Sequence, residues 1–332
     1  MTIKFYTTAI VTAMSDVDLG NLDDWTYAIE NNKKVLKTYK KKDWDNIIYV
    51  PKAGGTTIVN SYNVQMYGAN YAPFYNNFNI NRVDLQKVPF KDNSMWFSFS
   101  NCSNLTAVYN ISPSVQNMTL TFHGCYKLNH NIVLPTNLEY MNSAFTNCTN
   151  FNQNIKIPDK LISMDSAFKG CTNFNQNIPI ANPRWVRYAF SGCTNFNQNI
   201  QFHEGTRDFE STFYNCPNFN QKIKFPNSST WLPSTFSGCI KFNQSIQIPK
   251  DVTNMGYTFS NCRELSERID ILGTEVFNVT KCFNNTSKAK AVYIHYQYAN
   301  GTYTKTYNTC FGSSGIAGAY GVTMHDLGRS SW

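Results

Sequence analysis

Ten cysteines are the residues of this 332-residue chain whose type could do the most chemistry. Thiols pair as disulfides, bind zinc as thiolates, and act as nucleophiles beside a histidine. Eight of them follow one another at intervals of 22 or 23 residues: Cys102, Cys125, Cys148, Cys171, Cys193, Cys216, Cys239 and Cys262. No CxxC pair occurs, so the spacing argues against the common structural zinc sites.

One histidine lies close to this series. His123 precedes Cys125 by two residues, a pairing that could serve nucleophilic catalysis. The other four histidines share no motif with an acid and a nucleophile, and both GxGxxG and the P-loop pattern are absent. Because all eight cysteines hold equivalent places, we interpret Cys125 as a buried thiol, without a disulfide. We expect no catalytic residue, no metal and no cofactor.

The regular spacing itself predicts a stacked repeat. A phenylalanine precedes each of the eight cysteines by three residues: Phe99, Phe122, Phe145, Phe168, Phe190, Phe213, Phe236 and Phe259. One such coil cannot bury its apolar side alone, whereas stacked coils bury a continuous one. The cysteines and phenylalanines are therefore interpreted as a structural ladder.

The unit Cys148–Cys171 shows what one coil contains. Ile155 and Ile157 alternate with polar residues, which predicts a short strand with one buried face, and Pro158 ends it. The stretch Met164–Phe168 has apolar residues four apart and predicts a short helical turn. The strand signature recurs at Val108/Ile111, Ile132/Leu134, Ile178/Ile180, Ile200/Phe202, Ile223/Phe225, Ile246/Ile248 and Ile269/Ile271.

The unit resembles the bacterial leucine-rich repeats of the BspA and Treponema type, whose pattern is an IxIP strand followed by AFxxC. The run FNQNI, with a methionine four residues before the ladder phenylalanine, is most similar to the bacterial surface-protein repeat of the DUF285 family. The likeness covers roughly residues 93–286. It implies a solenoid that binds other molecules through its strand-lined face, and it implies no chemistry. Those families usually carry a secretion signal or a lipoprotein cysteine, and neither is recognised here.

The predicted fold is a β-rich solenoid of the α/β leucine-rich-repeat type, with a short strand and a short helical turn in each 23-residue coil. Residues 1–75 are expected to form a non-repetitive attachment or capping region. Residues 76–286 would form about eight to nine coils, the last with Phe283 on the ladder and Thr286 at the cysteine place. Residues 287–332 would form a β-hairpin cap and a Gly/Ser-rich tail.

In the first region, Asn21–Tyr39 is predicted to form one helix, with acidic residues near its start and lysines near its end. Ile47–Val50 is a predicted strand. The lysine run Lys33–Lys42 could bind phosphate, nucleic acid or lipid headgroups, but a solvated helix face is the interpretation that we favour.

In the last region, Ala291–Tyr307 reads as two alternating runs around Asn300-Gly301, which predicts a β-hairpin covering the final coil. The tail 312–332 would lack order alone. We expect the tail to dock on another surface, and a second subunit could supply that surface.

Polar residues also repeat from coil to coil. Asparagine and glutamine rows run through the FNQ segments, at Asn152, Asn175, Asn197, Asn220 and Asn243 and at Gln153, Gln176, Gln198, Gln221 and Gln244. They either hydrogen-bond from coil to coil or form a polar stripe that contacts a partner. We favour the structural interpretation for the asparagines and leave both open for the glutamines.

Outward positions of the strands differ from coil to coil while their neighbours stay constant. The candidate binding residues at these positions are Lys156, Gln201, Lys224, Gln247 and Asp270. A constant frame with a varying stripe is what a binding solenoid needs, although neutral drift of exposed positions gives the same pattern.

Composition bounds the function. The net charge of +8 is spread along the chain, charged residues are 15% and aromatic residues 15%. No signal peptide or run of 18 apolar residues is recognised, so we expect no membrane insertion, and no nucleic-acid binding. We expect a non-enzymatic binding or structural protein of a virion surface, such as a phage fibre that contacts a host.

Two alternatives stay open. One is a bacterial cell-surface adhesin, and the other is an enzyme with an unrecognised site in the N-terminal region. Residues 1–92 contain neither histidine nor cysteine, which speaks against the enzyme. The expected partners are other virion or surface proteins, through residues 1–75 and 287–332, and a host protein or glycan. A homo-oligomer is also compatible with the sequence.

Overall fold

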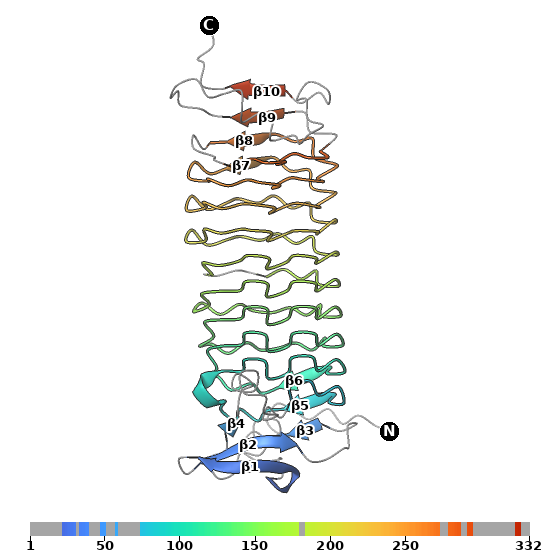
Figure 1. The fold of residues 1–332 in the computed structure, drawn as a ribbon, viewed down its shortest axis with the longest axis vertical. Coiled ribbons are helices and arrows are strands. Elements are labelled where there is room, and N and C mark those ends of the chain that lie inside the picture. The colour runs from blue at the N-terminus through green and yellow to red at the C-terminus, as the bar shows by residue number, and fades with distance from the viewer. Residues whose placement is uncertain are drawn as a thin grey trace, which may run out of the picture.

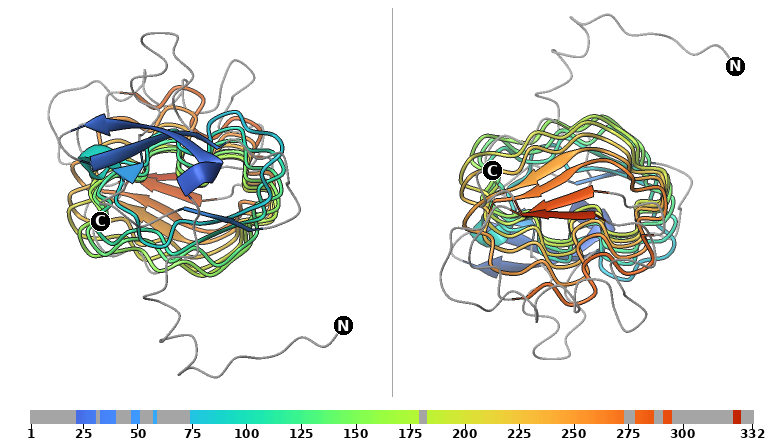
Figure 2. Two further views of the ribbon diagram at one scale, coloured as in Figure 1. Left: turned by 90° about the horizontal axis from the view of Figure 1, so that it is seen from below. Right: turned by 90° about the horizontal axis from the view of Figure 1, so that it is seen from above.

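The fold is given by a computed structural model. It describes residues 22–30, 33–39, 47–50, 57–58, 74–178, 183–272, 278–286, 291–294 and 323–326. The coils stack along one axis into an elongated solenoid (Figure 1), and successive coils superpose when the stack is viewed from either end (Figure 2). The repeat spacing therefore translates directly into coils placed one above another, as the sequence predicts.

Hydrogen-bonded strands line one side of the solenoid near both ends. At the N-terminal end, the predicted strand is present as β3 (Ile47–Tyr49), and it pairs in parallel with β5 (Arg82–Asp84), which pairs with β6 (Ala107–Tyr109). The C-terminal sheet has the order β10-β9-β8-β7. Its strands are β7 (Ile246–Ile248), β8 (Ile269–Ile271), β9 (Ala291–Ile294) and β10 (Thr323–Asp326).

The middle coils depart from the predicted strands. Ile155 and Ile157 are buried and Lys156 is exposed, so the alternation is confirmed, but these residues form no hydrogen-bonded ladder. In these coils the phenylalanines of the FNQ segments stack from coil to coil, 6.0 Å apart between Phe151 and Phe174 and 5.9 Å apart between Phe174 and Phe196. Ring stacking, rather than a strand ladder, therefore connects the middle coils beside these positions.

The opposite side of each coil consists of consecutive tight turns, so the predicted helical turn is wrong. The N–H of Ala167 bonds to the carbonyl of Met164 (3.0 Å), whereas the N–H of Met164 bonds to Trp185 of the next coil (3.0 Å). Ser166 and Gly170 have positive φ angles of 56° and 72°. Left-handed residues at this spacing cannot continue a helix. Because alternate N–H groups point to the next coil, this side bonds neighbouring coils together.

Two columns of phenylalanine rings fill the interior. Ladder phenylalanines stack from coil to coil, as between Phe145 and Phe168 (5.4 Å), and Phe168 also stacks on Phe174 of the FNQ column (4.8 Å). Both columns are fully buried. The ladder column extends before the repeat seen in the sequence, because Phe74 stacks on Phe99 at 4.6 Å. Sequence spacing misses this earlier coil because an asparagine, Asn77, stands where the cysteine would be.

The predicted N-terminal helix is replaced by a β-hairpin. A short 3₁₀ turn η1 (Leu22–Asp24) leads into β1 (Trp25–Glu30), which pairs antiparallel with β2 (Lys33–Tyr39). β4 (Thr57–Ile58) adds to β2 in parallel. Trp25, Tyr27 and Ile29 alternate in β1, and such residues favour strands over helices. The lysines of β2 therefore lie on a strand rather than on a helix face. A second 3₁₀ turn, η2 (Lys91–Asn93), precedes the first full coils.

The C-terminal cap also differs from the predicted hairpin. β9 has parallel neighbours on both edges, β8 on one and β10 on the other. Its four residues therefore cannot be one arm of an antiparallel pair, and residues 295–307 of the predicted hairpin lie outside the described residues. β10 shows that part of the tail adds a strand to the chain's own sheet. Phe283 stacks on Phe259 at 5.3 Å, and Thr286 is buried, so the ladder continues past the last ladder cysteine, Cys262.

Candidate binding surfaces

The cysteine ladder is a row of hydrogen-bonded buried thiols. Each thiol donates to the backbone carbonyl of the ladder phenylalanine in the preceding coil, as from Cys171 to Phe145 (2.9 Å) and from Cys193 to Phe168 (3.0 Å). The series continues to the first cysteine, Cys102. All nine cysteines in the described residues are free and buried. The thiols therefore fasten one coil to the next in addition to filling apolar space.

This environment opposes thiol chemistry. Burial raises the pKa of the Cys125 thiol far above its ordinary value, and that of Cys216 to about 12. Burial also lowers the pKa of His123, so this side chain favours its neutral form. A neutral thiol that already donates to Phe99 is a poor nucleophile. Among the described residues, no group of three or more His, Cys, Asp or Glu side chains is placed to hold a metal ion.

The amide rows join neighbouring coils. The side-chain oxygen of Asn152 accepts the backbone N–H of Asn175 (2.9 Å) and the side-chain amide of Gln176 (3.0 Å). The same pair of bonds recurs between later coils, as at Asn175, which accepts from Asn197 and Gln198. The structural interpretation therefore holds for the asparagines, and the glutamines share it.

The five candidate binding residues lie along the strand side, which we call the strand face. Lys156, Gln201, Lys224 and Gln247 are exposed. Asp270 is half-buried and forms an ion pair with Arg268 (2.7 Å). The structure therefore places these residues outward on successive coils, although the pairing with Arg268 gives Asp270 a local partner.

Two grooves hollow the strand face. The first, of about 790 Å³, is lined by residues 131–134, 154–156 and 158–160 with Thr136 and Asn177. The second, of about 730 Å³, is lined by residues 222–225 and 245–247 with Asn227, Pro249, Lys250, Asp270 and Leu272. Lys156 lies in the first, and Lys224, Gln247 and Asp270 line the second, whereas Gln201 lines neither. Three of the candidates thus converge on one depression.

A second surface was not predicted. The residue five places before each ladder phenylalanine pairs in a parallel bridge with its counterpart in the next coil, and we call this series the bridge row. Its members are Ser94, Asn117, Tyr140, Ser163, Trp185, Asp208, Trp231, Asn254 and Asn278. The sequence signal that reveals it is the alternation of aromatic and small polar residues from Asn117 to Asn254.

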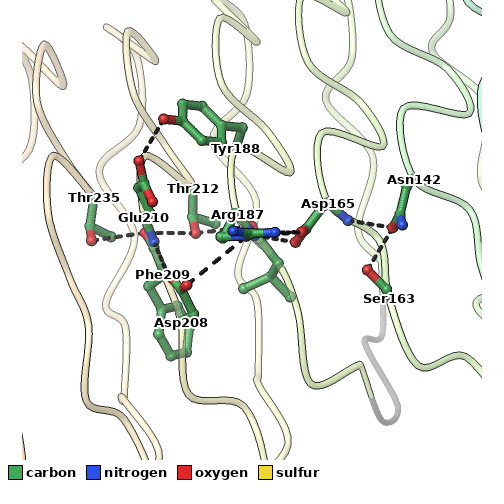
Figure 3. Close-up of polar contacts among 11 residues, drawn as sticks. Asn142, Ser163, Asp165, Arg187, Tyr188, Asp208, Phe209, Glu210, Thr212 and Thr235 are labelled. Atoms are coloured by element: carbon green, nitrogen blue, oxygen red, sulfur yellow. Dashed lines mark hydrogen bonds and ion pairs between the residues drawn. The ribbon is translucent and has the colours of Figure 1, made fainter.

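An ion-pair cluster lies beside the bridge row. Figure 3 shows Arg187 between two carboxylates of neighbouring coils, with Asp165 at 2.7 Å and Asp208 at 4.0 Å. In the same region Tyr188 donates to Glu210 (2.6 Å). Burial raises the pKa of Asp208, and the hydrogen bond to Glu210 raises the pKa of Tyr188. The cluster therefore contains one cation, Arg187, and three carboxyl groups, each of which has an ion-pair or hydrogen-bond partner within the surface.

Comparisons with known proteins agree with this architecture. A family model described as "Mycoplasma protein of unknown function, DUF285" matches residues 64–181, 135–224 and 184–296. A leucine-rich repeat protein from Bacteroides ovatus has a similar fold, with a TM-score of 0.66 and 21% identity over 91% of this chain and 74% of that one. No curated protein matches the chain.

A second solved structure has a weaker likeness. It is a leucine rich cell surface protein from Faecalibacterium prausnitzii, with a TM-score of 0.34 and 18% identity over 91% of this chain and all of that one. In the described part of this chain, no helix has the length and apolar character that crossing a bilayer requires.

Proposed function

This chain belongs to the DUF285 family, and we propose that it is a non-enzymatic binding protein that holds a partner molecule on its strand face. The observation that carries the proposal is the second groove. There, positions that vary between coils, Lys224, Gln247 and Asp270, meet in one depression, while the buried residues beside them repeat.

The charge of the grooves indicates the partner. Their linings contain five lysines and two aspartates. Asp270 is neutralised by Arg268, which leaves the lysines of the second groove as its dominant charge. Lysine side chains at the rim of an interface attract partners of opposite charge and accelerate their association. We therefore propose an acidic segment of a host or surface protein as the partner.

The absence of catalysis is part of the same proposal. The ladder thiols, which are the nucleophiles that the repeat places in every coil, are buried and donate to carbonyls. His123, which could have served as their base, has a pKa lowered by burial. These side chains hold the coils together and leave the binding of a partner as the role that the outward residues serve best.

The place of action is proposed as the surface of a bacterial cell, with the virion surface as the alternative. The family description names a bacterial genus, and the protein from Bacteroides ovatus with the similar fold also comes from a bacterium. Attachment would involve the two ends, residues 1–75 and 287–332. Immunogold labelling of intact cells and of purified phage particles distinguishes the two placements, since only one of them should bind antibody.

Charge reversal tests the binding face. The chain with Lys222→Glu, Lys224→Glu and Lys250→Glu is compared with wild type for binding to poly-L-glutamate by biolayer interferometry. The matched control reverses three exposed lysines that line neither groove: Lys127, Lys169 and Lys241. We expect the groove variant to lose binding and the control to retain it, with affinity falling as salt rises. Equal loss in both variants would show that only net charge matters and would overturn the proposal.

A further inference from the structure

Between Asn117 and Asn254, every second member of the bridge row is aromatic. Tyr140, Trp185 and Trp231 are 38%, 42% and 41% exposed. The coils between and beside them carry small polar residues: Asn117, Ser163, Asp208 and Asn254. Three large exposed rings thus lie in one line along the solenoid axis, with polar groups between them.

Local hydrogen bonds explain three of the small polar members of the row, Asn117, Asp208 and Asn254, but not the aromatic ones. The carboxylate of Asp208 accepts the backbone N–H of Glu210 (3.0 Å), two residues later in the same coil. A tryptophan cannot provide this bond. In the two tryptophan coils, no backbone N–H requires such an acceptor. The N–H of Arg187, two residues after Trp185, bonds to Asp165 of the preceding coil (2.9 Å). Pro233, two residues after Trp231, has no N–H. The tryptophan coils therefore lack the hydrogen bond that Asp208 forms within its own coil, and the tryptophans replace it with no other bond to the backbone N–H two residues later.

The spacing of the rings identifies a ligand shape. Bridged neighbours in a parallel ladder are about 4.8 Å apart, so rings two coils apart recur at about 9.6 Å. In an extended β-1,4-linked polysaccharide, each sugar spans about one coil, and successive sugars are turned over, so the same face returns at every second sugar. The C–H face of a sugar packs on an aromatic ring, while its hydroxyl groups reach polar side chains at the edge.

From this match we propose that the bridge row binds an extended, neutral β-1,4-linked glycan lying along the solenoid axis. Trp185 and Trp231 stack on sugars of the same orientation, and Tyr140 extends the line by two coils. This site is separate from the lysine-lined grooves, because no residue of the bridge row lines either groove.

The charges beside the row fit a neutral ligand. Arg187 is held by Asp165 and lies near Asp208, and Tyr188 donates to Glu210. This cluster holds one cation against three carboxyl groups, so it offers acceptors for sugar hydroxyl groups while its excess of negative charge disfavours an anionic ligand. Hydroxyl groups of a neutral sugar complement such a surface, whereas a polyanion gains little from it.

Affinity gel electrophoresis with hydroxyethylcellulose, a soluble β-1,4-glucan, tests the proposal. We expect the full-length protein to be retarded by this polymer and not by amylose, whose α-1,4 linkages coil the chain. Trp185→Ala and Trp231→Ala should each weaken binding by about tenfold, which corresponds to about 1.4 kcal/mol. Trp185→Phe, which keeps a ring, should retain most of the retardation. Tyr126→Ala removes an exposed aromatic outside the row and should change nothing.

Other results would overturn the assignment. These are equal retardation by amylose, no retardation by either polymer, or unchanged retardation after both tryptophan substitutions. Sedimentation velocity supplies a further check. If the wild-type chain self-associates and Trp185→Ala abolishes the association, then a second copy covers the row in place of a glycan. The groove variant with three lysines reversed should keep its glycan binding, so failure of this proposal and failure of the strand-face proposal are distinguishable.

Discussion

Mildly alkaline pH should destabilise this protein steeply, because unfolding releases thiols that the solenoid keeps protonated. The perturbation is a rise from pH 8.5 to 9.5. Burial raises the pKa of all eight ladder thiols in the folded state, Cys216 for example to about 12. An unfolded thiol has a pKa of about 8.5. Over this pH range the folded state therefore binds more protons than the unfolded state, so the free energy of unfolding falls as pH rises.

The magnitude follows from the number of thiols. In the unfolded chain a thiol goes from about half ionised to about nine-tenths ionised over this unit of pH, which costs the folded state about 1 kcal/mol per thiol. Eight thiols give about 8 kcal/mol, which is comparable to the whole stability of many domains. Tyrosines and lysines contribute little at these pH values, since their ordinary pKa values are about 10 or higher.

Urea unfolding followed by circular dichroism at both pH values, with a phosphine reductant present, measures this slope. Cys171→Ala should reduce the slope by about one eighth, because it removes one of the eight titrating groups. Alkylation by iodoacetamide, located by mass spectrometry, should leave the ladder thiols unmodified in the native protein at pH 8.5 and modify them in urea at the same pH. A slope near zero, or rapid alkylation of the native ladder, would refute the reasoning.

Further predictions concern the turns, the ring columns and the ion-pair cluster. Gly124→Ala should lower the free energy of unfolding by about 1 kcal/mol more than Gly192→Ala. Both glycines have positive φ, but only at Gly124 would the new Cβ lie 2.7 Å from the Asn101 side-chain oxygen. Denaturant melts should show that the difference disappears when Asn101→Gly is combined with each substitution. Phe168→Ala should lower the free energy of unfolding by about 3–5 kcal/mol, since its fully buried ring stacks on both columns; a loss below 1 kcal/mol would contradict continuous packing. The raised pKa of Asp208 means that its contribution to stability falls as pH rises above the ordinary carboxyl pKa of about 4. Asp208→Asn should therefore flatten the stability profile just above that pH, and an unchanged profile would contradict the prediction.

The sequence predicts the stacked frame because the frame depends on periodic residue types. A cysteine, two phenylalanines and an FNQ segment recur at a fixed spacing, and any arrangement that buries them all at equivalent places must stack the coils. The alternation at Ile155 and Ile157 likewise identifies the outward position, so Lys156 is found correctly on the surface.

Features that depend on backbone geometry could not be derived from the same patterns. The stretch Met164–Phe168 has helical spacing, yet Ser166 adopts a left-handed conformation because alternate N–H groups bond to the next coil. Ile155 and Ile157 alternate as in a strand, yet the middle coils form no hydrogen-bonded ladder there, and residue types alone do not reveal this difference. The first coil was missed because Asn77 replaces the cysteine.

For the candidate surfaces, too, the sequence predicts some features and only the structure shows the others. Sequence variation identifies the strand face, but only the structure shows that Lys224, Gln247 and Asp270 share one groove and that Gln201 does not. The bridge row is visible in the sequence as alternating aromatic and polar residues. Only the parallel bridges show that those residues lie in one line, and the repeat pattern does not specify these bridges.

Hydrogen–deuterium exchange of the full chain, with and without poly-L-glutamate, tests the central claim most directly. The account predicts that the polymer slows exchange in the segments 222–227, 245–250 and 270–272, which contain the lining of the second groove, and leaves the turn side of the same coils unchanged. Slower exchange confined to the turn side, or no change at a polymer concentration that saturates binding, would contradict the claim that the strand face is where this solenoid holds its partner.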